Sequence, residues 1–150
     1  MADNGIIRAY TPESFGACRE LFIEVFNGEP WHDNWTDESA GACLREIVGH
    51  QRFFGFTLWE EDTLMGAALC HGKTWCKGSE VIVDELFISP DCRHRGYGTA
   101  LMEAVEGYAR ENGLTSIALL TDREYPAFGF YKGQGYRESK YMVWIYRRME

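Results

Sequence analysis

Two adjacent carboxylates interrupt a strand that is otherwise apolar. Asp84 and Glu85 lie inside residues 80–89, a run whose first half is rich in β-branched side chains, as in strands at the centre of a sheet. A carboxylate that faces a cleft can accept a proton from a bound substrate. Because successive strand residues point to opposite faces, the sequence predicts that at least one of the two does so. The alternative left open for each is a carboxylate that faces solvent or pairs with a structural arginine.

The segment after this strand has the composition of an anion-binding loop. It reads Arg93-His94-Arg95-Gly96-Tyr97-Gly98-Thr99 and leads into a helix expected to end near Asn112. The two glycines let the backbone turn tightly and approach a ligand, while the free amides and positive end of the helix attract anions. Such a loop has room for two phosphates. Neither the Gly-x-Gly-x-x-Gly of a dinucleotide-binding loop nor the Gly-Lys-Ser/Thr of a nucleotide P-loop occurs;.

The elements that must position this strand and loop can be read from hydrophobic periodicity and capping residues. A capping threonine precedes each of two amphipathic helices, and a short acidic turn joins two β-rich runs;. The sequence predicts strands at 5–10, 52–60, 63–71, 80–89, 116–121 and within 136–147, helices from 11 to about 27, from 36 to about 49, from 98 to about 112 and at 125–132, and a loop at 73–78.

Strand, helix and strand follow one another between residues 80 and 121, which predicts a parallel pair with a right-handed crossover. No repeat or low-complexity linker divides the chain;. We therefore expect one α/β domain over residues 1–150, with a central, mostly antiparallel mixed sheet flanked by helices.

Composition narrows the class of protein. The chain has 150 residues, of which 45% are hydrophobic and 25% charged, as in a soluble globular protein with one core. Residues 1–5 carry no basic or apolar leader, and no apolar run is long enough to span a membrane;. A net charge of -8 argues against nucleic-acid binding and favours a cationic substrate.

Cysteine and histidine spacing predicts neither a disulfide framework nor a metal site. The five cysteines are odd in number and contain no Cys-x-x-Cys pair, and no two of the four histidines have a helical ligand spacing;. We expect reduced thiols, a cytoplasmic protein and no metal.

The arginine-led glycine loop resembles the pyrophosphate-binding motif of the GNAT superfamily of N-acetyltransferases, Gln/Arg-x-x-Gly-x-Gly/Ala. The preceding strand end, residues 86–90, fills the place of the family's Leu-x-Val-like pattern. Further on, Ala127-Phe128-Gly129-Phe130-Tyr131 followed by Gly135-Tyr136 is similar to the family's Ala-x-x-Phe-Tyr segment and Gly-aromatic pair. The order of elements fits this family over nearly the whole chain.

This resemblance implies acetyl-CoA as cosubstrate, lodged where the fourth and fifth strands splay apart. The backbone at Phe87 and Ile88 is expected to pair with the pantetheine arm, and the amides of Arg93, His94, Arg95, Gly96, Tyr97, Gly98 and Thr99 to hold the pyrophosphate. Tyr131 matches the tyrosine that protonates the departing thiolate in many relatives. Glu124 departs from the family pattern, because many relatives have asparagine three residues before the alanine.

In the family the region between the first two helices usually forms one wall of the acceptor site. Trp31 and Trp35, with Trp75 from a later loop, are candidates to enclose an amine by cation–π contact, and Asp33 to pair with its charge;. The alternative for each tryptophan is packing that secures the loop to the core.

The sequence thus predicts direct transfer of an acetyl group to a primary amine, most readily that of a small cationic molecule. Polyamines, aminoglycoside-like compounds and amino acid derivatives rank first; a protein or peptide amine is the alternative. The proton acceptor is left open between Asp84, Glu85 and ordered water. A non-catalytic acetyl-CoA sensor is the alternative of another class, and a homodimer is left open as an assembly.

Overall fold

The computed structural model describes residues 5–150, and the chain falls into two compact units, residues 1–120 and 121–150. Residues 1–4, on which the expected absence of a leader partly rests, lie outside the described residues. Each unit is described by itself, and the single domain over 1–150 stays a prediction. No helix in the described part of the chain is long and apolar enough to cross a membrane.

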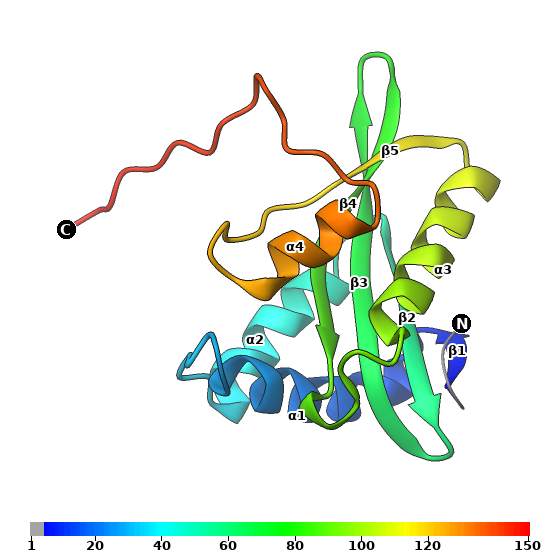
Figure 1. Cartoon of the computed structure of the whole chain (residues 1–150), viewed down its shortest axis with the longest axis vertical. Helices are drawn as coiled ribbons and strands as arrows, with labels where there is room; N and C mark the ends of the chain where they lie inside the picture. Colours follow the sequence, from blue (N-terminus) through cyan, green and yellow to red (C-terminus); the bar gives the residue numbers. More distant parts are fainter. Residues whose placement is uncertain (1–4) are drawn as a thin grey trace. The chain divides into compact units, whose positions relative to one another are not determined.

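The first unit is built on a five-stranded mixed sheet (Figure 1). Its strands, in both chain and spatial order, are β1 (Ile6–Ala9), β2 (Phe53–Glu60), β3 (Thr63–Trp75), β4 (Gly78–Ile88) and β5 (Leu114–Ala118). Neighbouring strands are antiparallel except β4 and β5, which are parallel. The predicted fold class is confirmed, including the parallel pair on either side of a crossover helix.

Helices cover both faces of this sheet (Figure 1). α1 (Phe15–Asn27) and α2 (Asp37–Val48) share a core cluster with Ala67 and Leu69 of β3, whereas α3 (Tyr97–Glu111) packs on the opposite face. A Cβ at Gly66 would come within 3.1 Å of Leu101 of α3, as expected because consecutive strand residues point to opposite sides. Short 3-10 turns, η1 (Pro12–Ser14) and η2 (Pro90–Cys92), precede α1 and α3.

The second unit contains one helix, α4 (Pro126–Gly133), and residues 136–147 form no strand. The strands predicted there are therefore wrong. The run Tyr141-Met142-Val143-Trp144-Ile145-Tyr146 has strong β propensity, but a strand also needs a partner for its backbone N–H and C=O groups. No strand within residues 121–150 supplies one.

The hairpin between β3 and β4 is longer than the sequence predicted. Residues 73–75, expected in a loop, are the last three residues of β3, and Trp75 pairs with Gly78 across a two-residue turn. Gly78 has φ = 134°, a conformation that side chains other than glycine rarely adopt. A side-chain hydrogen bond also joins the two strands near the turn: Trp75 Nε1 on β3 donates to Glu80 on β4 at 2.6 Å.

The start of α2 was predicted from its capping residues, and the structure has the full capping box. Thr36 Oγ1 accepts from the Ser39 amide at 3.0 Å, and Ser39 Oγ accepts from the Thr36 amide at 2.9 Å. These bonds satisfy amides that have no carbonyl partner in the first helical turn. Leu44 on the same helix is 1% exposed and lies in the core.

Thr36→Ala is expected to lower the free energy of unfolding by about 1 kcal/mol, because it removes the hydroxyl acceptor at the helix start. Urea unfolding followed by circular dichroism measures the change. Thr36→Ser keeps the hydroxyl and is the matched control, expected to stay near the wild-type value. Equal destabilisation by both substitutions would show that the cap contributes nothing beyond the threonine methyl group.

Candidate active site

β4 continues well past its pairing with β5. The parallel ladder joins Ser79 to Leu114, Val81 to Ile117 and Ile82 to Ala118, whereas pairing with β3 continues to Ile88. Residues 83–88 therefore have no β5 partner within the first unit. Unpaired strand edges present N–H and C=O groups to which an extended ligand can add as a further strand.

Phe87 and Ile88, predicted to bind the pantetheine arm, lie on this unpaired edge. The Phe87 side chain is 2% exposed, and its ring contacts Phe22 and Phe26 of α1 at 5.7 and 6.1 Å between centroids. Phe87 can therefore offer a ligand only its backbone. Within the first unit, the geometry leaves that backbone edge unpaired.

A β-bulge at Asp84 brings the two candidate carboxylates to one face of the sheet. Leu69 of β3 pairs with Glu85, but the next residue, Cys70, pairs with Val83, so Asp84 is an extra residue in β4. A bulge of this kind redirects side chains and breaks the alternation of the strand. Glu85 thus shares the α1 and α2 face with Leu69, and Asp84 turns to His71 on that same face.

The environment of Glu85 favours its neutral form. Burial, together with the nearby charges of Asp84 and Asp33, raises the pKa of Glu85 from 4.5 to about 7;. The pKa of the Cys43 thiol on α2 is raised by burial and by Glu85, Glu46 and Asp84. Asp33 and the adjacent pair Asp84 and Glu85, from two separate parts of the sequence, therefore form one acidic cluster, whose charge also reaches Cys43 of α2.

His71 contacts this cluster, although sequence reasoning did not identify it as a site residue. Its Nδ1 lies 2.6 Å from Asp84 Oδ2, and its ring stacks on that of His50 with centroids 4.0 Å apart and planes at 26°. These contacts arise because β3 pairs with β4 on one side, near Asp84, and with β2 on the other, near His50. Residue spacing along the chain does not indicate this pairing.

The predicted coenzyme loop opens α3, and Gly96 is its N-cap with φ = 82°. The first-turn amides at Tyr97, Gly98 and Thr99 have no carbonyl four residues earlier within the helix. They lie at the positive end of a helix of 15 residues, the arrangement that binds phosphate groups in many proteins. His94 also has a positive φ of 68°, so the loop turns sharply just before the helix.

Glu60, at the end of β2, binds two side chains of this loop. Tyr97, 1% exposed, donates its hydroxyl to Glu60 Oε2, and the Arg95 guanidinium lies 3.2 Å from the same oxygen. The Arg95 side chain is thus paired with a carboxylate, and the loop offers a ligand chiefly its backbone amides. Sequence reasoning missed Glu60, because it lies in a hairpin 35 residues before Arg95.

The predicted acceptor residues of the α1–α2 connection are partly engaged in packing. Trp31 contacts Phe26 at 5.0 Å and the Arg93 guanidinium at 5.7 Å, and Trp35 contacts Phe22 at 5.0 Å. Trp35 Nε1 also donates to Asp33 at 3.1 Å.

Trp75 lies apart from this connection, at the tip of the β3–β4 hairpin, 53% exposed and with Lys73 over its ring at 4.8 Å. The charge of Asp33 thus acts on Glu85, whereas Trp75 lies at the tip of the β3–β4 hairpin.

Tyr131 belongs to α4 in the second unit, where its ring contacts Phe130 at 5.1 Å and Tyr136 at 5.6 Å between centroids. Its predicted role as proton donor stays a prediction. Glu124 precedes this helix, and its amide donates to Asp122 Oδ1 at 2.8 Å.

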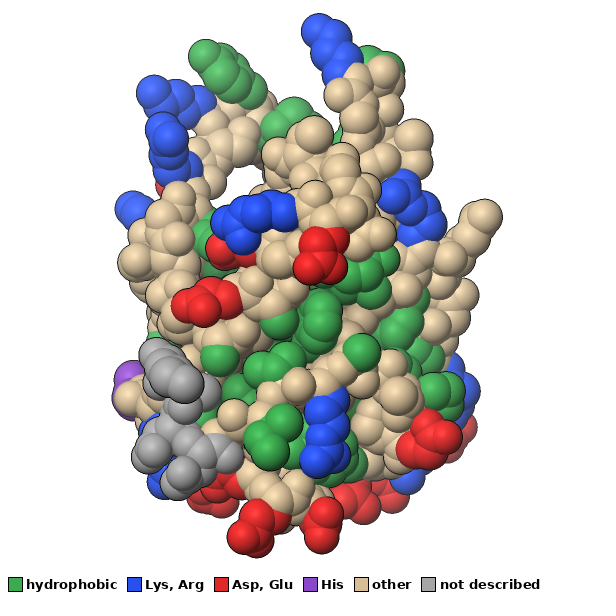
Figure 2. Space-filling model, turned by 90° about the vertical axis from the view of Figure 1, so that its right-hand side faces the viewer, with side chains coloured by type: hydrophobic (Ala, Val, Ile, Leu, Met, Phe, Trp, Pro, Cys, Tyr) green, Lys and Arg blue, Asp and Glu red, His purple; other side chains and the backbone are tan. Residues whose placement is uncertain are grey.

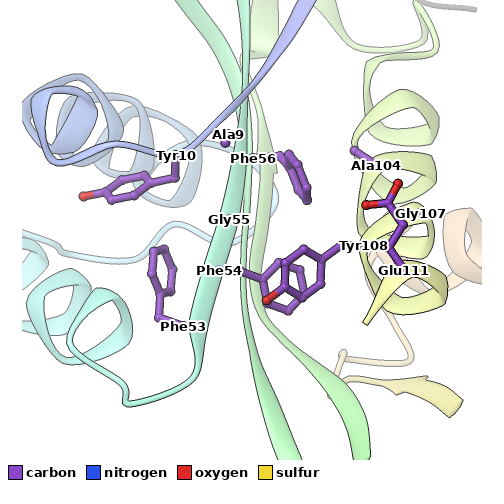
Figure 3. A pocket seen from close by; sticks show the side chains of 10 residues that line it. All are labelled: Ala9, Tyr10, Phe53, Phe54, Gly55, Phe56, Ala104, Gly107, Tyr108 and Glu111. Atoms are coloured by element: carbon purple, nitrogen blue, oxygen red, sulfur yellow. The ribbon is translucent and has the colours of Figure 1, made fainter. Parts of the chain in front are cut away.

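A pocket between β2 and α3 lies outside the predicted site (Figure 3). Aromatic rings fill much of its wall, with Phe54 and Tyr108 stacked at 3.7 Å between centroids. The pocket contains none of the residues predicted for catalysis or coenzyme binding. In Figure 2 apolar side chains also reach the surface in the middle of the face shown, with acidic side chains along its lower edge.

Among residues 5–150 no group of three or more His, Cys, Asp or Glu side chains is arranged to hold a metal ion. Cys92, next to the coenzyme loop, is 1% exposed, and burial raises the pKa of its thiol. A reactive cysteine needs an accessible thiolate, so Cys92 lacks the character of a nucleophile.

The sequence model of the acetyltransferase (GNAT) family matches residues 15–136, whereas no curated protein sequence matches the chain. One similar solved structure is AAC(6')-Iy in complex with the bisubstrate analogue CoA-S-monomethyl-acetylneamine, with 20% identity, a TM-score of 0.76, and coverage of 98% of this chain and 100% of that chain.

Two further structures are similar in fold. An aminoglycoside acetyltransferase, meta-AAC0020 from an uncultured soil metagenomic sample, in complex with sisomicin, has 15% identity and a TM-score of 0.76, covering 98% of this chain and 97% of that chain. A possible acetyltransferase from Clostridium difficile 630 has 10% identity and a TM-score of 0.82, covering 99% and 100%.

The raised pKa of Glu85 gives a prediction for stability. Below pH 4.5 the residue is protonated in both the folded and unfolded chain, and above about pH 7 the folded chain must hold it ionised. Glu85→Gln is therefore expected to raise the free energy of unfolding relative to wild type by up to about 3 kcal/mol above pH 7, with the gain lost towards pH 4.5;.

Urea unfolding at pH 4, 6 and 8 measures this difference. The matched control is Glu103→Gln, which neutralises an exposed carboxylate on α3 and is expected to change stability little at each pH. If the gain in the free energy of unfolding for Glu85→Gln is the same at each pH, ionisation of Glu85 does not destabilise the folded chain.

Proposed function

The chain belongs to the GNAT acetyltransferase family, whose model covers residues 15–136, and we propose that it transfers the acetyl group of acetyl-CoA to the primary amine of a small cationic molecule. The single observation that carries this proposal is the acidic cluster at the β4 bulge. The charges of Asp84 and Asp33 act on Glu85 there, beside the strand edge that β5 leaves unpaired.

Acetyl-CoA would occupy the unpaired edge of β4 and the start of α3. The backbone of Phe87 and Ile88 would pair with the amide groups of pantetheine as an added strand. The amides from Arg93 to Thr99 would hold the pyrophosphate, because they combine free donors with the positive end of α3. The support for this placement is the pairing pattern of β4 and the φ of 82° at Gly96.

The acceptor would be held by charge. Grouping carboxylates around the buried Glu85 costs free energy unless a cation joins them, so an ammonium group is the natural partner of this cluster;. A net charge of -8 would also attract cations;. The similar aminoglycoside acetyltransferase crystallised with sisomicin supports aminoglycoside-like acceptors, and polyamines and amino acid derivatives carry the same chemical group.

The reaction requires two proton movements. The ammonium must lose a proton before its nitrogen attacks the thioester carbon, and the C–S bond then breaks to release a thiolate, which takes up a proton. Glu85, Asp84 or ordered water would accept the first proton, and Tyr131 would donate the second. Catalysis would come mainly from holding the amine against the thioester.

A peptide amine is the alternative acceptor, and an acetyl-CoA sensor without transfer is the alternative of another class. We place the protein in the cytoplasm, without nucleic-acid or membrane partners, and keep a homodimer open. Trp31 and Trp35 remain proposed contacts for the acceptor, and Trp75 is one for an acceptor long enough to reach the tip of the β3–β4 hairpin.

An amine screen tests the proposal. Thiol release from acetyl-CoA should depend on a polyamine or an aminoglycoside more than on a short peptide, and kcat/KM should fall as salt rises, because charge attraction is screened. Asp33→Asn should lower kcat/KM for cationic acceptors by roughly tenfold through KM. Acetylation of the peptide alone would reject the small-cation acceptor, and coenzyme binding without amine-dependent thiol release would indicate a sensor.

Glu60→Gln tests the coenzyme loop. Loss of the carboxylate charge should loosen Arg95 and Tyr97 and weaken acetyl-CoA binding by roughly tenfold, about 1.4 kcal/mol, as measured by calorimetric titration. Glu61→Gln is the matched control, because it removes the same charge from the adjacent, exposed residue of the turn. Equal affinities for the two variants would remove Glu60 from the support of this loop.

A further inference from the structure

We propose that His71 is the residue that accepts the proton of the amine, and that Asp84 positions it. This inference rests on the proposed function and assigns one step of it. Asp84 was a candidate proton acceptor from the sequence, but the structure engages its carboxylate with His71 Nδ1 at 2.6 Å. The role of acceptor thus passes from the carboxylate to the imidazole.

The hydrogen bond determines which ring nitrogen is available. An ionised carboxylate only accepts hydrogen bonds, so His71 carries its proton on Nδ1 and presents the lone pair of Nε2. The His71 side chain makes no other hydrogen bond in the described part of the chain, while the His71 backbone belongs to the sheet. A neutral imidazole held by a carboxylate in this way is an effective proton acceptor.

The bulge makes this arrangement fit the acceptor site. Because Asp84 is an extra residue in β4, its side chain reaches back to His71 on the face that also carries Glu85. Side-chain exposures of 16% for His71 and 24% for Asp84 leave the pair partly open to solvent. The proton received by His71 can therefore pass to water.

The other charged and titratable groups around His71 leave Nε2 free. His50 covers one ring face, and its own Nδ1 accepts a hydrogen bond from the Arg52 amide at 3.1 Å. The Arg52 guanidinium lies over Gly72 and donates to Thr74 at 2.7 Å and to Ser79 at 3.3 Å. From α2, Cys43 borders the carboxylates of the cluster.

The proton balance of the step is complete. An ammonium held by Glu85 gives one proton to His71 Nε2, which leaves an imidazolium paired with Asp84. The amine nitrogen then forms a bond to the acetyl carbon while the C–S bond breaks. After the attack the nitrogen loses a second proton, and the thiolate takes up one proton. These two cancel, so the net release is one proton per turnover, the one that His71 accepted.

The experiment compares His71→Gln with wild type on an accepted amine. We expect kcat/KM for the amine to fall by about 10²–10⁴-fold, as for loss of a general base, with the Kd for acetyl-CoA unchanged. His71→Ala should recover activity when imidazole is added, which a purely structural role does not predict.

Two variants separate the positioning role from the stacking contact. Asp84→Asn should reduce kcat/KM as strongly as His71→Gln, because an amide that donates to Nδ1 moves the imidazole proton to Nε2. His50→Phe keeps a stacked ring and is expected to retain activity within about threefold, a small change beside the effect of losing a base.

Wild-type kcat/KM in His71→Gln across the pH range would overturn this inference while leaving the proposed function intact. So would a loss explained entirely by weaker acetyl-CoA binding. If wild type releases no thiol with any amine, the proposed function fails and the assignment of His71 fails with it.

Discussion

The candidate site depends on how β4 changes partners along its length. Up to Ile82 the strand is paired on both sides, and beyond it only β3 remains. The bulge at Asp84 lies just past that point, so the strand gains an unpaired edge and a cluster of carboxylates in the same few residues. One local departure from regular pairing thereby supplies a place for an extended coenzyme and a place for a cation.

Two supports keep the ligand-facing parts of the first unit in place. The side chain of Phe87 is anchored among the aromatic rings of α1, so its backbone is presented by a buried strand. Glu60, the last residue of β2, binds the side chains of Tyr97 and Arg95. The loop before α3 is therefore held by side-chain bonds as well as by the elements that it connects. Rigid support of this kind reduces the ordering that a ligand must bring about on binding.

Local signals in the sequence were enough for most of the fold. The capping threonine of α2, the glycine at the start of α3 and the parallel pair around that helix were all predicted from spacing and residue type. The strand end at residues 73–75 and the missing strands at 136–147 were not, because a strand is defined by its partner as well as by its own residues.

Some residues of the candidate site were predicted and others were missed, again because strand pairing is not visible in the sequence. Asp84 and Glu85 were identified as carboxylates in an apolar strand, but alternation alone could not place both on one face. His71 and Glu60 were missed, since their importance arises from pairing between distant segments. Long-range contacts of this kind leave no pattern in a single sequence.

The extra residue in β4 also bears on how such a site can arise. Val83 pairs with Cys70 and Glu85 with Leu69, so a strand without Asp84 would keep the same partners and the same buried faces. The sheet therefore carries a residue that its packing does not require. A position of this kind is free to vary under selection for chemistry, because changes there leave the hydrophobic core and the strand register as they were.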